Sequence, residues 1–181
     1  MRSKRTCLVM GCILLAMSTS TLEAVWFPPP PPRGCYFTPY FSDTERLGDG
    51  VPWFQSCYTS AVRGVLCQGS NCDNLYLACC PEPAVRFETG YWSEWFSEEE
   101  GEQVCVRGSY VTGMSCDGTR CDNLRIYCKS HDALTEQCRW TDFFSEEQGY
   151  GGCASSEVVA GVRCRGSYCD DLSLRCCVPL P

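Results

Sequence analysis

The clearest structural information in this chain lies in the segment CRGSYCDDLSLRCC (residues 164–177), because closely similar segments occur twice before it. They read CQGSNCDNLYLACC at residues 67–80 and CDGTRCDNLRIYC at residues 116–128. The middle cysteines, Cys72, Cys121 and Cys169, are 49 and then 48 residues apart. A period of this length indicates one supersecondary unit that recurs along the chain.

Each of these segments joins two strand-like runs through a short turn that contains glycine. The run before the third turn alternates Val158, Ala160 and Val162 with Val159, Gly161 and Arg163. Such alternation is typical of half-buried strands, and glycine gives a hairpin turn the backbone freedom that it needs. No segment has a sustained helical period, so the sequence predicts an all-β protein.

The three units extend upstream to an aromatic and acidic phrase, which reads FTPYFSDTE (37–45), WSEWFSEEE (92–100) and WTDFFSEEQ (140–148). We therefore take the repeats as residues 35–80, 90–129 and 138–177 of a single domain, 35–181. A linear array would expose apolar faces at both ends, whereas three matched units can close on one another. We expect three disulfide-stapled β repeats in a pseudo-threefold closed assembly, β-prism-like, with a β-trefoil as the alternative.

The region before the repeats has the features of an export signal and a linker. Basic residues precede the apolar run CLVMGCILLAM (7–17), which is too short to span a bilayer. We expect a signal peptide at 1–24, cleaved after Ser20 or Ala24, and a proline-rich linker at 25–34. Removal of 1–24 would leave 16 of the 18 cysteines and change the formal net charge from −7 to −9.

An even number of cysteines in an exported chain predicts a disulfide framework and a secreted, extracellular location. The acidic balance excludes a nucleic-acid-binding role, which requires a basic surface. No later stretch is apolar enough to be a transmembrane segment.

The cysteine pairing is partly readable from a comparison of the repeats. The first and third repeats have two cysteines that the second lacks, where Gly90 and Lys129 stand instead. Two positions that lose cysteine together are best explained as partners, because either cysteine alone would leave a free thiol. This predicts the disulfides Cys35–Cys80 and Cys138–Cys177.

Four cysteines then remain in each repeat, and three pairings of them are open. We favour a bond across the turn and a bond from the first cysteine to the fourth. The predicted pairs are Cys67–Cys72, Cys116–Cys121, Cys164–Cys169, Cys57–Cys79, Cys105–Cys128 and Cys153–Cys176. Strand parity opposes the bond across the turn, since Cys164 falls on the core-facing side and Cys169 on the polar side. Pairing of the second cysteine with the fourth is the rival.

Metal binding and catalysis have little support in the sequence. There is no C-x-x-C pair, and His131 is the only histidine, so zinc sites and a Ser-His-Asp triad lack their residues. The acidic phrases lack the calcium-loop spacing, and a calcium site would need Asp73, Asp122 or Asp170 brought close. We expect no metal, no cofactor and no enzymatic activity, with the acidic residues solvated or capping turns.

The repeated aromatic residues are the best candidates for a binding surface. Aromatic rings stack on sugar rings, and tryptophan also favours the membrane interface. The alternative is that these side chains fill the core, which we expect for the repeated phenylalanines. The ligand-binding candidates are therefore Trp92, Trp95 and Trp140.

The string W-x-x-x-F-S-E-E followed by C-x-G-S-x-C-D-N-L resembles the cysteine-rich triplicated β modules that end some perforin-like pore-forming proteins. The resemblance covers residues 35–177 and implies a role in target or membrane recognition, without a pore-forming domain. Our interpretation is a secreted, non-enzymatic module that binds a glycan, a lipid surface or an extracellular protein. A structural protein of a matrix or coat and a secreted defence or venom-type effector are the alternatives.

Overall fold

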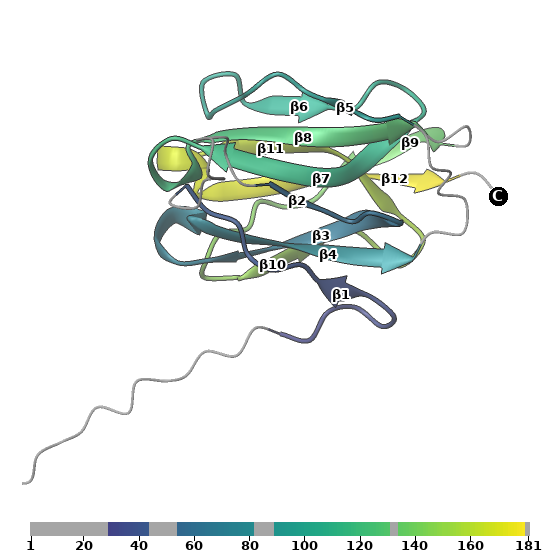
Figure 1. Cartoon of the computed structure of the whole chain (residues 1–181), viewed down its shortest axis with the longest axis horizontal. Coiled ribbons are helices and arrows are strands. Elements are labelled where there is room, and N and C mark those ends of the chain that lie inside the picture. Colours follow the sequence, from purple (N-terminus) through teal and green to yellow (C-terminus); the bar gives the residue numbers. More distant parts are fainter. Residues whose placement is uncertain (1–28, 44–53, 82–88, 131–133, 180–181) are drawn as a thin grey trace, which may run out of the picture.

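The computed structural model describes residues 29–43, 54–81, 89–130 and 134–179, which form an all-β fold (Figure 1). The signal peptide expected at 1–24 lies outside the described residues, and the expected linker is described only from Pro29 onward. The strands form three four-stranded sheets. We number the sheets by the order of their hairpins along the chain.

Each sheet is built around one antiparallel hairpin. The first sheet has the order β1 (Tyr36–Phe37), β4 (Asn74–Pro81), β3 (Ser60–Gln68) and β10 (Tyr150–Gly152). The second has the order β2 (Phe54–Ser56), β7 (Ser109–Asp117), β8 (Asn123–Ser130) and β5 (Tyr91–Trp92). The third has the order β6 (Glu102–Val104), β11 (Val158–Arg165), β12 (Asp171–Pro179) and β9 (Leu134–Trp140). The three hairpins predicted from the repeated segments are confirmed.

The turns of the hairpins are short 3₁₀ segments, η1 (Ser70–Cys72), η2 (Thr119–Cys121) and η3 (Ser167–Cys169). All three contact one another and lie at the same end of the molecule, on the left of Figure 1. Because Cys169 belongs to η3 and not to β12, the strand-parity objection to a Cys164–Cys169 bond does not apply.

The strict alternation expected in β11 is wrong. Val158, Val159 and Ala160 are all buried, because the register between β11 and β12 shifts between Val159 and Gly161. Equivalent shifts occur in β3 and β7, and a bulge of this kind turns consecutive side chains toward different surroundings.

The repeats exchange strands, which the sequence does not reveal. The short strand that precedes the first cysteine of a repeat pairs with the hairpin of a different repeat: β2 with β7, β6 with β11, and β10 with β3. Glycine makes this close approach possible in two sheets. A Cβ atom on Gly113 or Gly161 would lie 2.9 Å from a backbone oxygen of the borrowed strand.

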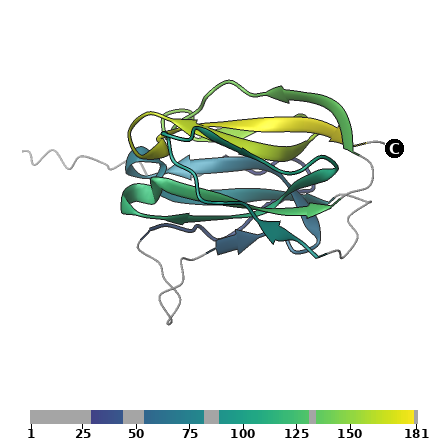
Figure 2. The ribbon, with the colours of Figure 1, turned by 90° about the horizontal axis from the view of Figure 1, so that it is seen from above.

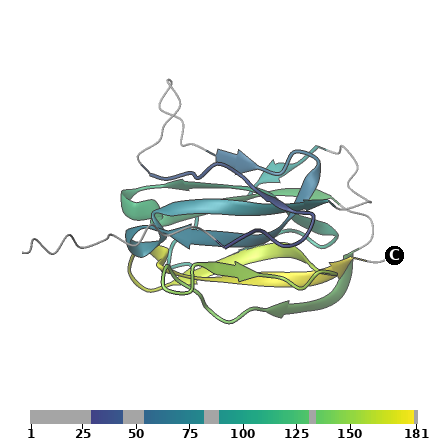
Figure 3. The ribbon, with the colours of Figure 1, turned by 90° about the horizontal axis from the view of Figure 1, so that it is seen from below.

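The larger of two buried hydrophobic clusters in the described part of the chain contains side chains from all three repeats. The central strands β3, β7 and β11 contact one another. Figures 2 and 3 show the yellow-green third sheet on one side of the molecule and the blue and teal strands on the other. The sheets therefore bury their inner faces against each other and leave their outer faces available.

Eight disulfides staple this fold, and each lies within one repeat. They are Cys35–Cys80, Cys57–Cys79, Cys67–Cys72, Cys105–Cys128, Cys116–Cys121, Cys138–Cys177, Cys153–Cys176 and Cys164–Cys169. These are the pairs expected from the sequence. Disulfides of this density are typical of proteins that fold in an oxidising compartment.

Candidate functional site

The repeated aromatic phrase divides into core residues and residues of the outer sheet faces. Its last aromatic position, Phe41, Phe96 or Phe144, is buried and forms a backbone bridge to the first leucine of the hairpin's second strand. The core assignment of these phenylalanines is confirmed. The two earlier aromatic positions of each phrase remain partly exposed.

In the second sheet these two earlier positions hold Trp92 and Trp95, which enclose Arg125 from β8. The guanidinium carbon lies 4.4 Å from the ring centroid of each tryptophan. Burial lowers the pKa of Arg125, and nearby Asp117 partly offsets this effect. A guanidinium between two indoles is a favourable cation–π arrangement, so it fixes both rings in place.

The other two sheets fill the same region differently. In the third sheet Trp140 and Phe143 enclose Arg163, with centroid distances of 4.6 and 4.7 Å. In the first sheet Tyr40 packs on Tyr76, at a centroid distance of 5.9 Å. The ligand-binding candidate Trp140 is thus held in the same way as Trp92 and Trp95, but on a separate sheet.

A pocket of about 310 Å³ opens beside Trp92 on the second sheet. Three more aromatic side chains and one lysine line it, together with smaller residues; the described lining residues are Phe54, Ser56, Cys57, Tyr58, Trp92, Thr112, Tyr127 and Lys129. Trp95 and Trp140 are not among them. Of the three candidates named from the sequence, the structure therefore places Trp92 in a concave site.

The aromatic walls of this pocket are packed on one another. Phe54 meets Trp92 edge to face at a centroid distance of 5.7 Å, and Tyr127 lies 5.0 Å from Trp92 on its other side. Tyr58, by contrast, is 75% exposed, so its ring forms a wall that faces solvent. The Lys129 ammonium donates a hydrogen bond of 3.3 Å to the backbone oxygen of Tyr58. Rigid aromatic walls and few polar groups are typical of a small-molecule site.

The pocket occurs in the repeat that lacks one disulfide. Lys129 holds the position of Cys80 and Cys177, and its partner position is Gly90. A Cβ atom on Gly90 would lie 2.5 Å from the Tyr127 ring and 2.7 Å from the backbone oxygen of Cys128. The ring therefore occupies the space next to Gly90 that a half-cystine side chain would need.

Sequence reasoning missed Phe54, Tyr58, Tyr127 and Lys129. Phe54 and Tyr58 belong to the first repeat and reach this pocket only because β2 joins the second sheet. The available signal was the departure of Gly90 and Lys129 from the cysteine pattern, which marks where the second repeat differs from the others.

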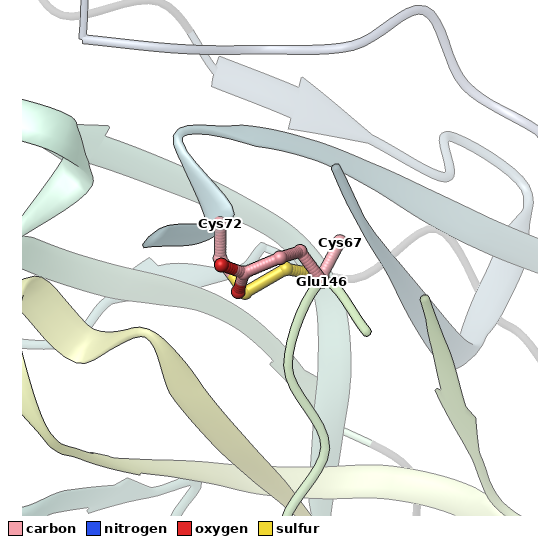
Figure 4. A group of neighbouring side chains, drawn as sticks. All are labelled: Cys67, Cys72 and Glu146. Carbon is pink, nitrogen blue, oxygen red and sulfur yellow. A yellow bond between two sulfur atoms is a disulfide. The ribbon is translucent and has the colours of Figure 1, made fainter. Parts of the chain in front are cut away.

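In the part of the chain that the structure describes, two groups of residues have metal-ligand spacing, but their cysteines are already bonded. Figure 4 shows Glu146 against the disulfide of Cys67 and Cys72; these ligand atoms lie within 4.8 Å of one another. Cys153, Glu157 and Cys176 form the second group. A disulfide sulfur is not a thiolate, which is the form that binds metal. Glu157 is also engaged by two hydrogen bonds from the Arg139 guanidinium, of 3.0 and 2.8 Å.

The acidic phrases close local turns. Glu100 accepts hydrogen bonds from the backbone N–H and the hydroxyl of Ser97, at 2.9 and 2.7 Å. In the third repeat the Gln148 side chain accepts the equivalent bonds from Ser145. Since a neutral amide serves here as well as a carboxylate, the phrase has a capping role that does not need charge.

Two of the aspartates that follow the turns, Asp73 and Asp170, are partly buried, and burial raises the pKa of both carboxyl groups. Burial raises the pKa of Asp73, and the neighbouring Asp43 raises it further. Asp43 in turn accepts a hydrogen bond of 2.8 Å from the backbone N–H of Arg120. The Asn74 amide donates to the Asp73 carboxylate at 2.7 Å. Asp73 and Asp43 therefore each accept a hydrogen bond from a neighbouring amide group.

Comparison with protein-family models, with curated proteins and with solved structures finds no match for this chain. Within the residues that the structure describes, no helix is long and apolar enough to cross a membrane. The site is therefore interpreted from its own chemistry.

Proposed function

We propose that this protein is an exported, non-enzymatic recognition module that binds carbohydrate in the pocket of the second sheet. The observation that carries the proposal is the convergence of four aromatic side chains and a lysine on one pocket of about 310 Å³. Aromatic rings offer flat apolar faces to the C–H faces of sugar rings, and the hydroxyl and ammonium groups can bond the sugar oxygens. Its size suits one or two sugar units within the usual range of ligand pockets.

A carbohydrate ligand fits this pocket better than a lipid surface. Tryptophans that insert into a membrane must project from the protein, whereas Trp92 and Trp95 are partly buried and enclose Arg125. The resemblance to recognition modules of perforin-like proteins agrees with a binding role for either target. A membrane-binding mode is therefore tested beside the carbohydrate mode.

Export is part of the proposal because a chain with eight disulfides needs an oxidising compartment to form them. The signal-like sequence at 1–24 supports the same conclusion. We propose no enzymatic activity because the acidic side chains described above cap turns or are paired with other groups.

We further propose that the three sheets form one closed, pseudo-threefold assembly of the β-prism kind. The strand exchange supports it, since each hairpin receives a strand from another repeat in cyclic order. The turns support it as well: the Sγ atoms of Cys72, Cys121 and Cys169 lie 3.1, 3.6 and 3.5 Å from backbone oxygens of Asp170, Asp73 and Asp122. Three separate sheets favour this arrangement over a trefoil.

The test is co-sedimentation of the oxidised protein with insoluble polysaccharides and with liposomes. Tyr58→Ala is the informative variant, because removal of a ring that is 75% exposed leaves the fold intact. Tyr36→Ala is the matched control, an exposed tyrosine on the first sheet. We expect polysaccharide binding that Tyr58→Ala weakens at least fivefold and Tyr36→Ala leaves unchanged.

Three results would contradict the proposal. Binding to liposomes alone would assign the protein to membrane recognition. Pelleting without any matrix would favour the structural, self-assembling alternative. Equal polysaccharide binding by the wild type and Tyr58→Ala would place the carbohydrate site elsewhere.

A further inference from the structure

The pocket on the second sheet has polar side chains that only donate hydrogen bonds, and its described lining has no side chain that only accepts them. The whole chain has 22 acidic and 15 basic residues, yet among the described residues that line the pocket there is one cation, Lys129, and no carboxylate or side-chain amide. An ammonium and an indole N–H only donate, and hydroxyl groups donate as readily as they accept. A pocket with this lining selects a ligand that is rich in acceptors.

Neutral sugars and sugar acids differ in the number of hydrogen-bond donors and acceptors that they present. A neutral sugar presents a hydroxyl donor at nearly every carbon, and a matching site needs carboxylate or amide acceptors for those hydrogens. A sugar acid replaces one hydroxyl-bearing group by a carboxylate or sulfate, whose oxygens accept only. A sugar acid therefore needs fewer hydrogen-bond acceptors from the protein than a neutral sugar does, and the described lining of the pocket has few acceptors to offer.

Lys129 is well placed to meet such a group. It contacts the backbone oxygen of Tyr58 at 3.3 Å, which occupies one of the three hydrogens of the ammonium. Tyr127 and Trp92 lie on the same side of the sheet and can stack on the ring of the sugar. An anion held by the ammonium would therefore carry its ring against the aromatic wall.

The charge of the protein limits the ligand further. A formal net charge of −7 opposes an extended polyanion such as a nucleic acid, whereas one anionic group can pair with one lysine at close range. Charge-assisted hydrogen bonds to a carboxylate are about twice as strong as neutral ones, so the pair contributes selectivity as well as affinity.

We propose that the pocket recognises a sugar acid, with the Lys129 ammonium bound to its carboxylate or sulfate and the ring stacked against the aromatic walls that Tyr58, Trp92 and Tyr127 form. This inference rests on the proposed carbohydrate-binding function and specifies the substrate class of the same site. Lys129 is then the residue that determines specificity, and the aromatic side chains provide affinity that is independent of ligand charge.

The test compares each acid with its neutral counterpart by ligand-observed NMR titration of the oxidised protein. The probes are methyl glucuronide, methyl galacturonide and the methyl glycoside of N-acetylneuraminic acid, each beside its carboxyl methyl ester, and methyl glucoside beside its 6-sulfate. We expect the wild type to prefer at least one acid over its neutral partner by roughly tenfold or more, as a hydrogen bond to a charged group predicts. The ester and sulfate pairs show whether carboxylate or sulfate is the preferred group.

Two variants assign the preference to the ammonium. Lys129→Gln should abolish the preference for the acid while retaining weak binding of the neutral partner, and Lys129→Arg should retain the preference. The preference should also weaken with added salt, since an ion pair open to solvent is screened.

Failure of this inference is distinguishable from failure of the proposed function. Equal binding of acids and neutral partners, lost in Tyr58→Ala, would overturn the sugar-acid inference and keep the carbohydrate site. A preference that survives in Lys129→Gln would overturn it as well. Binding of none of the probes, together with no polysaccharide co-sedimentation, would overturn both.

Discussion

The second sheet and the other two sheets share one scaffold. They differ at the place where the start of each repeat lies beside the end of its hairpin. In the first and third sheets this place is covalently closed by Cys35–Cys80 and Cys138–Cys177. In the second sheet Gly90 and Lys129 stand there, the Tyr127 ring lies over Gly90, and a pocket is present nearby. The comparison teaches that the second repeat can have a pocket where the other two have a crosslink, because eight disulfides and a common core maintain the fold.

The largest expected effect tests what the sheets have in common. Phe41→Ala, Phe96→Ala and Phe144→Ala should each lower the free energy of unfolding by about 3–5 kcal/mol, because each removes a buried ring from the shared core. Urea unfolding of the oxidised variants measures this. Tyr40→Ala, which removes a ring that is 42% exposed, is the control with a small effect. A cost for Phe96→Ala far below the other two would mean that the second sheet is not part of one cooperative core.

The next prediction introduces into the second sheet the disulfide that the first and third sheets have. A Gly90→Cys/Tyr127→Ala/Lys129→Cys variant should form a ninth disulfide, since the new pair has the same sequence separation of 39 residues as Cys138–Cys177. Tyr127 must be shortened because its ring lies 2.5 Å from the new Cβ atom, and Ala78 holds its position in the first sheet; the backbone at Cys128, whose oxygen lies 2.7 Å from that atom, must also shift. The crosslink should add about 2–4 kcal/mol to the free energy of unfolding, less the contribution of the lost tyrosine ring.

This conversion should also remove ligand binding, because it deletes the cation and one aromatic wall of the pocket. Thiol counting and intact mass measure the bond, and titration with the sugar probes measures binding. The Tyr127→Ala variant alone separates loss of the wall from closure by the disulfide. A variant that forms the disulfide and still binds sugar would show that the pocket and the missing crosslink are unrelated.

The shared parts of the molecule were predictable from the sequence, whereas the pocket was only partly so. Three copies of one cysteine pattern allow internal comparison, and this is why the hairpins and the choice of disulfide partners could be inferred. The strand-parity argument failed at Cys169 because a 3₁₀ turn, not a strand, contains that residue. Trp92 was recognisable as a candidate because aromatic residues recur at its position.

The remaining pocket residues depend on an exchange of strands that leaves little trace in the sequence. The borrowed strands have the sequences FQS, EQV and YGG, which share no residue pattern because three residues of edge strand need only backbone bonds. The one readable sign is a glycine inside two of the hairpin strands, Gly113 and Gly161, where another backbone approaches closely. Such a glycine predicts that another backbone lies close by, but it does not predict which strand this is.

A smaller effect tests the cation held by the aromatic residues of the second sheet. Arg125→Gln should lower the free energy of unfolding by about 1 kcal/mol, because it removes the guanidinium between Trp92 and Trp95. The near-ultraviolet circular dichroism of the tryptophans should weaken, and sugar affinity should fall as Trp92 loses its support. Tyr36→Ala, which removes an exposed tyrosine ring on the first sheet, is the control and should leave the tryptophan signals unchanged. Unchanged tryptophan signals in Arg125→Gln would show that the stacking does not order these rings.

The smallest expected effect is a difference in how the equivalent turns of the second and third repeats respond to a fall in pH. Hydrogen bonds from the Ser97 hydroxyl and N–H lower the pKa of Glu100, so its turn is stabilised above the pKa of the unfolded chain and loses this stabilisation as pH falls through the lower, folded pKa. In the third repeat Gln148 makes the same bonds and does not titrate. The Ser97 amide resonance should therefore shift with pH, with a midpoint below the usual pKa of glutamate, and Glu100→Gln should abolish that shift while preserving the turn. If the shift persists in Glu100→Gln, the neighbouring Glu98 or Glu99 causes it, and the difference between the two turns does not arise from this hydrogen bond.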